Sequence, residues 1–203
     1  MFKTNEIKPE VIKRIFKENF STINIKFLIH QSEFMTGIYG RYFNDLESAS
    51  IVIYFAKGLH RLILRQREID LNHDISFNNF YENHKKFDLS GFKVIDVARH
   101  SGLPRETVRR KINELIKFKV LKKNNQKITW DPLMPEKITY NILVKKNIHS
   151  LAKLIRNVLI FFDKEKSLKN IEEEIEKNYS FYWYHYLNTQ QKFFKDWQKN
   201  MKD

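Results

Sequence analysis

Apolar side chains recur every three to four positions along most of this 203-residue chain, the spacing of one face of an α-helix. The pattern predicts helices over 9–20, 23–43, 45–68, 76–86, 139–163 and 168–202. Pro9, Asp45 and Ser76 stand where three of them begin, because proline suits a first helical turn and Asp and Ser cap one. The helix over 45–68 is apolar around much of its circumference, so we expect it in the core or at a subunit contact.

Residues 92–130 depart from this pattern and predict two short helices with a tight turn between them. Ala98 is small enough to let a second helix cross closely. Gly102, four positions later, suits a turn that needs a positive φ, which glycine adopts at little cost. Pro104 or Arg105 opens the second helix, which we expect to cover 104–119.

The second helix has two contrasting faces. Apolar residues recur at helical spacing on the face expected to be buried, at Val108, Ile112, Leu115 and Ile116. The other face carries polar and mostly basic residues, at Arg105, Glu106, Arg109, Arg110, Lys111, Asn113 and Lys117. We therefore expect a cationic helix that is exposed to solvent.

A small basic hairpin follows this helix in the prediction. Its strands are expected at 120–122 and 127–130, with Asn124 and Asn125 as the turn, since asparagine tolerates left-handed conformations. The expected fold is mainly α with a small β-hairpin wing over 120–130, a winged helix-turn-helix flanked by N- and C-terminal helices. The chain then divides into an N-terminal helical region (1–75), the winged helix-turn-helix (76–132) and a C-terminal helical region (133–203).

The run from Gly102 to Arg110 resembles the recognition helix of the catabolite-activator/Fnr superfamily, with its Arg-Glu-Thr-Val-x-Arg core. The layout also resembles MarR-type and other winged-helix bacterial regulators. The resemblance covers about 40 of the 203 residues. Two positions depart from it: Lys111 replaces a usually apolar residue, and Lys119 replaces a common glycine. The first 90 residues look helical, so no cyclic-nucleotide barrel is expected.

The resemblance implies that base edges are contacted by Arg105, Glu106 and Arg110, and a phosphate by Thr107. Arginine pairs with guanine in two hydrogen bonds, and glutamate accepts one from cytosine. Long basic side chains expected to reach phosphate oxygens are Arg109, Lys111, Lys117, Lys122, Lys123 and Lys127. Double-stranded DNA is thus the expected partner of this segment.

Charge favours the same interpretation. Residues 91–130 hold eleven Lys and Arg against three acids, so they carry well over half of the net +13 of the chain. The expected function is a sequence-specific DNA-binding regulator of transcription. Two alternatives stay open: an accessory DNA-binding protein of replication or nucleoid organisation, and a winged helix that docks proteins.

Other chemistry finds little support. The chain has no cysteine, its seven histidines lack metal-ligand spacing, and no phosphate loop or nucleophile elbow is present, so we expect no metal, cofactor or enzymatic activity. No apolar run is long enough to cross a membrane, and no signal core precedes the first helix, which favours the cytoplasm.

Surplus apolar helix outside 92–130 predicts a homodimer held by the terminal helices, with two recognition helices about one DNA turn apart. The run from Phe181 to Tyr186 contains six consecutive aromatic or imidazole side chains, which one helix cannot all turn inward. We expect this run to serve core and dimer packing, and a small-molecule effector pocket is its alternative.

Overall fold

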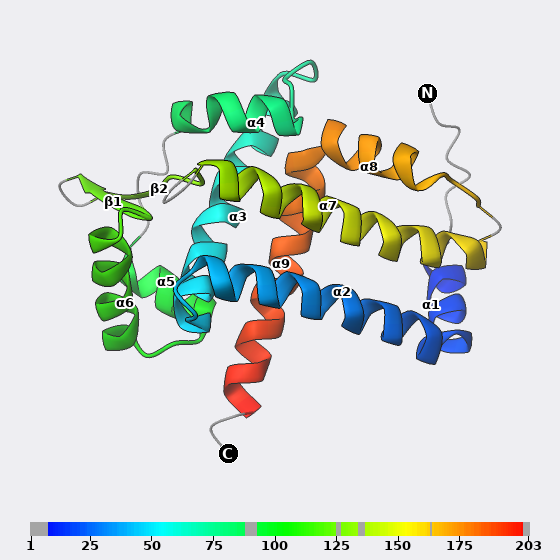
Figure 1. The fold of residues 1–203 in the computed structure, drawn as a ribbon, viewed down its shortest axis with the longest axis horizontal. Helices are drawn as coiled ribbons and strands as arrows, with labels where there is room; N and C mark the ends of the chain where they lie inside the picture. Colours follow the sequence, from blue (N-terminus) through cyan, green and yellow to red (C-terminus); the bar gives the residue numbers. More distant parts are fainter. Residues whose placement is uncertain (1–7, 88–92, 125–126, 134–136, 163, 201–203) are drawn as a thin grey trace.

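The structure, a computed structural model, describes residues 8–87, 93–124, 127–133, 137–162 and 164–200. Within these ranges the chain is mainly helical, with one two-stranded antiparallel hairpin (Figure 1). The elements in order are α1 (Pro9–Glu18), α2 (Phe20–Arg41), α3 (Leu46–Ile69), α4 (Phe77–Asn83), the 3-10 turn η1 (His84–Lys86), α5 (Val94–Ser101), α6 (Arg105–Lys117), β1 (Leu121–Asn124), β2 (Lys127–Trp130), α7 (Lys137–Leu159), the 3-10 turn η2 (Ile160–Phe162), α8 (Leu168–Lys177) and α9 (Tyr179–Asn200).

Helix α3 is the central element. Asp45 caps its first turn by accepting a hydrogen bond from the Glu47 N–H at 3.0 Å, as the sequence predicted for this position. Every residue from 48 to 56 is buried, which confirms the expected core position of this helix. Helices α5, α6 and α9 all contact α3, so the core residues of these helices form one continuous cluster with it.

Helices α2 and α7 run side by side in opposite directions on one face of the molecule (Figure 1). Gly37 of α2 lies against α7, since an added Cβ atom would lie 2.6 Å from Leu143 Cδ1. A larger residue at position 37 would therefore require the Leu143 side chain to move. The α5–α6–hairpin unit lies at the opposite end of α2 from α1 (Figure 1).

The predicted helices are confirmed with ends within four residues of the expected ones, except that the last prediction is wrong. The expected helix over 168–202 is two helices, because the chain breaks at Asn178. The Asn178 side chain donates to the Glu174 carbonyl at 3.2 Å and so competes with continued helical bonding. The break lets Tyr179 turn into the core, where it is fully buried.

The predicted hairpin is confirmed, but one residue expected in its turn lies in a strand. Asn124 was expected in the turn, but it lies in β1 and pairs with Lys127. The first strand begins at Leu121, one residue later than predicted, because Val120 closes the end of α6. Asn125, the other expected turn residue, lies outside the described residues.

Candidate nucleic-acid interface

The turn between α5 and α6 has the geometry that the sequence predicted. Gly102 has φ 78° and ψ 1°, in the left-handed region, and its N–H donates to the Ala98 carbonyl at 3.0 Å. Pro104 is the N-cap of α6, so the helix begins at Arg105. This fixed turn holds α6 across α5, and both helices pack on α3.

Helix α6 buries its apolar face as predicted. Val108, Ile112 and Leu115 are buried, and Ile116 is partly buried against the same core. These side chains contribute to the cluster that includes α3, so the orientation of α6 is set by the body of the protein. The opposite face is thereby turned outward.

The connection from α6 to the hairpin is a tight, bonded turn. Lys119 has φ 62°, a left-handed conformation that glycine adopts more easily than lysine. The Lys119 N–H donates to the Ile116 carbonyl and the Val120 N–H to the Leu115 carbonyl, both at 2.9 Å. These bonds satisfy carbonyls at the helix end and fix the direction of the hairpin. Lys119 thus stands where the catabolite-activator/Fnr pattern commonly has glycine, and it takes a glycine-like conformation.

The hairpin buries one set of side chains and exposes two lysines. Leu121, Ile128 and Trp130 are buried, whereas Lys122 and Lys123 are exposed. Lys122 Nζ lies 3.4 Å from Asp131 Oδ2, just past the end of β2. Lys127 lies in β2, but its side chain is outside the described residues.

Asp131 ties the hairpin to the 3-10 turn η1. Its carboxylate lies 3.4 Å from His84 Nε2 and 3.6 Å from Lys85 Nζ, and it accepts the Leu133 N–H at 3.1 Å. The hydrogen bond from His84 is the main reason that the pKa of Asp131 lies well below its usual range. The base of the hairpin is therefore anchored by an ionised carboxylate.

One stripe of α6 is exposed along its full length, and its members recur every four residues: Arg105, Arg109, Asn113 and Lys117. Within the described part of the chain, Arg105 has no hydrogen-bond or ion-pair partner. Arg109 Nη1 pairs with Glu106 Oε2 at 3.1 Å, and both side chains remain more than half exposed. An exposed pair of this kind is weak, so Arg109 can leave the Glu106 carboxylate and bind another anion.

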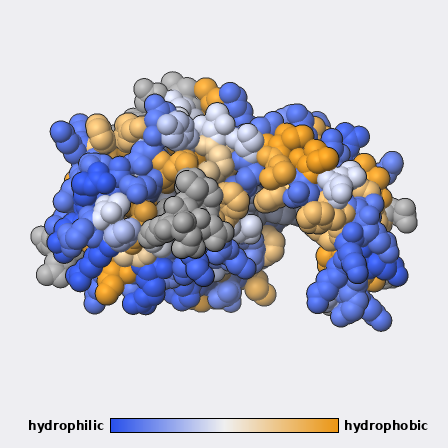
Figure 2. Space-filling model, turned by 90° about the horizontal axis from the view of Figure 1, so that it is seen from below, coloured by the Kyte–Doolittle hydropathy of each residue, from blue (hydrophilic) through white to orange (hydrophobic). Residues whose placement is uncertain are grey.

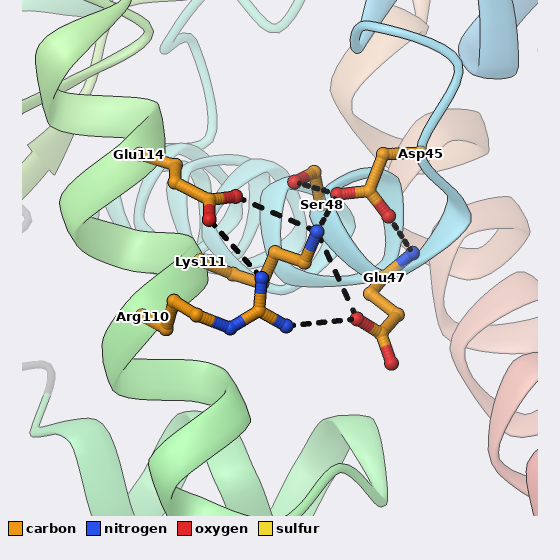
Figure 3. Close-up of polar contacts among 6 residues, drawn as sticks. All are labelled: Asp45, Glu47, Ser48, Arg110, Lys111 and Glu114. Atoms are coloured by element: carbon orange, nitrogen blue, oxygen red, sulfur yellow. Dashed lines mark hydrogen bonds and ion pairs between the residues drawn. The ribbon is translucent and has the colours of Figure 1, made fainter.

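A second side of α6 faces the start of α3 and is partly neutralised. Arg110 Nη1 lies 3.1 Å from Glu114 Oε1, and Arg110 Nη2 lies 3.9 Å from Glu47 Oε2 (Figure 3). The Arg110 side chain is nevertheless 58% exposed. This arginine is therefore accessible to solvent, but its charge already has two acidic neighbours.

Lys111 was predicted to contact DNA, and the structure gives it a different role. It was expected to reach a phosphate, but its Nζ lies 2.5 Å from Asp45 Oδ2 and only 13% of the side chain is exposed (Figure 3). Burial opposes ionisation of both groups, yet their mutual hydrogen bond lowers the pKa of Asp45 and raises that of Lys111. Lys111 thus fastens α6 to α3 and is not available to a ligand.

Two parts of this surface were not found from the sequence. Asp45 was identified as a helix cap, but not as the partner of a residue 66 positions away. The signal was Lys111 itself, since a lysine at an inward position of a helix requires an acid close by. Asn113 was placed on the polar face without a role, although it lies between Arg109 and Lys117 on the exposed stripe.

The remaining predicted contacts differ in exposure. Glu106 is exposed, and Thr107 at the first turn is partly buried. The aromatic run of α9 divides between two environments: Trp183 is buried and stacks on Tyr179 at 5.0 Å between ring centroids, whereas Phe181 is exposed. The inward part of the run therefore serves core packing.

Among the described residues, no group of three or more His, Cys, Asp or Glu side chains is arranged to hold a metal ion. In the same part of the chain, none of the helices combines the length with the apolar character needed to cross a bilayer. Comparisons with models of protein families, with characterised proteins and with solved structures returned no match to this chain.

Proposed function

We propose that α5, α6 and the hairpin form a winged helix-turn-helix and that the protein is a sequence-specific DNA-binding regulator of transcription. The observation that carries this proposal is the exposed stripe of α6. Arg105, Arg109, Asn113 and Lys117 project from a helix that the core holds by its other face. A helix of this width fits the major groove of DNA.

The exposed side chains have the chemistry for both kinds of DNA contact. Arg105 has no competing partner within the described residues, so it is the strongest candidate for a two-bond contact with guanine. Asn113 has the amide that pairs with adenine in the same way, and Glu106 can accept from cytosine. Thr107, Arg109 and Lys117 are suited to phosphate oxygens, as are Lys122 and Lys123 of the hairpin. Arg110 is proposed to contact a base edge, and its guanidinium must first leave Glu47 and Glu114.

Selection of bound fragments from a random pool of duplex DNA tests this proposal. A regulator is expected to enrich one sequence and to prefer it over random duplex by roughly three orders of magnitude or more. Duplex binding without enrichment would favour an accessory DNA-binding protein of replication or nucleoid organisation. Failure to bind duplex at moderate salt would favour protein docking, with an acidic partner on the α6 stripe.

A further inference from the structure

Helix α2 carries apolar residues on two sides, and only one side is covered. Phe34 and Ile38 are buried in the core. On the other side, Ile25, Leu28 and Ile29 are 57%, 54% and 52% exposed. A helix that is apolar around its circumference is normally buried all round, so the second side lacks a cover within the described chain.

The uncovered side borders a cleft between α2 and α7. The cleft has a volume of about 570 Å³ and is lined by residues that include Ser32 and Thr36 of α2 and Ile142 and Leu143 of α7. Ile142 is itself an exposed large apolar residue. Seen from below, hydrophobic surface gathers between the centre of the molecule and the end where α1 lies (Figure 2). The uncovered side of α2 and the cleft thus form one apolar face, here called the α2–α7 face.

The spacing along α2 suits a packed helix pair. Positions 25 and 32 are seven apart, as are 29 and 36, and Leu28 lies between them. Apolar and small residues repeated at this interval form the seam of helices that pack side by side. Ser32 and Thr36 are small, so a second helix can approach closely there.

Acidic and basic residues both lie at the rim of the cleft, so the rims of two copies are complementary in charge. Glu33 of α2 is exposed, as are Lys146 and Lys153 of α7. Within the described residues the two lysines have no ion-pair partner, and Glu33 accepts a hydrogen bond from the Ser150 hydroxyl. An acid on one helix and bases on the other can pair across a two-fold axis, because such an axis brings the same patch of both copies together.

We propose that the occupant of the α2–α7 face is a second copy of this chain. Two copies associate about a two-fold axis, and each lays Ile25, Leu28 and Ile29 against the cleft of the other. Glu33 of each copy then faces the two cleft lysines of its partner. No residue of α6 or of the hairpin takes part, so the association can be tested separately from DNA binding.

Sedimentation equilibrium over a micromolar concentration series, without DNA, is the first test. The wild-type chain is expected to be a dimer, and Leu28→Glu or Ile29→Glu is expected to weaken self-association roughly tenfold or more. Leu71→Glu is the matched control, since Leu71 is a large apolar residue that is 75% exposed, lies between α3 and α4, and does not line the cleft. A wild-type chain that stays monomeric, or a control that weakens association equally, would overturn the proposal.

Mixing two charge variants tests the two-fold pairing itself. One variant carries Glu33→Lys, and the other carries Lys146→Glu with Lys153→Glu. Each alone places like charges across the axis and is expected to self-associate weakly, whereas an equimolar mixture restores every opposite-charge pair and should dimerise as the wild type does. Circular dichroism confirms that both variants are folded. A mixture no tighter than the separate variants would contradict the pairing of Glu33 with these lysines.

Discussion

Lys111 Nζ lies 2.5 Å from Asp45 Oδ2, and this contact joins the outward-facing helix α6 to the first turn of α3. Asp45 also accepts hydrogen bonds from the Glu47 N–H at 3.0 Å and the Ser48 hydroxyl at 2.5 Å. One carboxylate therefore caps the central helix and anchors the candidate DNA-contacting helix. The position of α6 is set by this anchor together with its buried apolar face.

Replacing Lys111 with methionine should destabilise the fold and leave the number of contacts with DNA phosphates unchanged. The methionine keeps the apolar stem but leaves the Asp45 carboxylate without its partner, and removal of one member of a largely buried pair is costly. We expect a loss of about 2 kcal/mol in the free energy of unfolding, smaller than for a fully buried pair, measured by urea denaturation. The salt dependence of DNA binding should keep its wild-type slope.

Lys117→Met is the matched control for that measurement. Lys117 is exposed on the same helix, and it has no ion-pair partner within the described residues. Its replacement should change stability by less than about 0.5 kcal/mol and should reduce the salt slope of DNA binding by about one unit. The reverse pattern, with the slope reduced by Lys111→Met, would show that Lys111 contacts phosphate after all.

Glycine at position 119 should stabilise the protein. Lys119 has φ 62°, and a left-handed conformation costs a residue with a Cβ roughly 1 kcal/mol that glycine does not incur. The more flexible unfolded chain of the variant offsets part of this gain, so we expect Lys119→Gly to raise the free energy of unfolding by about 0.5 kcal/mol. Thermal unfolding of the two proteins measures the difference. A lower stability would mean that the lysine side chain makes a contact worth more than the strain.

Acid should destabilise the fold through His60. Burial lowers the pKa of this side chain to about 3, while its ring stacks on Phe80 and Nδ1 lies 3.2 Å from the Ser180 hydroxyl. The unfolded chain has the ordinary value of 6.5, so it binds a proton that the folded chain does not. The contribution of neutral His60 to the free energy of unfolding is therefore fully present above about pH 6.5. It falls as the pH drops towards 3, with a loss of about 2 kcal/mol at pH 5.

Urea denaturation at pH 7 and pH 5 checks this expectation. His60→Phe should lose most of the difference between the two pH values, because phenylalanine does not titrate. His185→Gln, at an exposed position of α9, is the control and should keep the wild-type difference. An unchanged pH dependence in His60→Phe would show that another group is responsible.

Local patterns were enough to predict most elements of this fold. Apolar spacing located α3 and the buried face of α6, and Gly102 and Pro104 marked the turn between α5 and α6. The break at Asn178 was missed, because aromatic and polar residues on both sides continue a helical pattern, and that pattern shows neither the Asn178 side-chain bond nor the burial of Tyr179. Propensity along the chain does not report on such a requirement.

The candidate interface was predictable in composition but not in pairing. Sequence identifies Arg105, Arg110 and Lys111 as basic residues on one polar face, and it predicts a DNA contact for all three. Their environments differ because Asp45 and Glu47, more than 60 positions earlier, lie beside one edge of that face. Long-range packing therefore determines which of these three basic side chains stays available to a ligand.

Competition between two duplexes gives the sharpest test of the α6 stripe as a sequence reader. Affinities for the selected duplex and for a scrambled duplex of equal length are measured at one fixed salt concentration for the wild type, Arg105→Ala and Lys122→Ala. We expect the wild type to prefer the selected duplex by roughly a thousandfold and Arg105→Ala to lose about tenfold or more of that preference. Lys122→Ala should weaken both duplexes alike. Equal preference in the wild type and Arg105→Ala would contradict the reading role of α6.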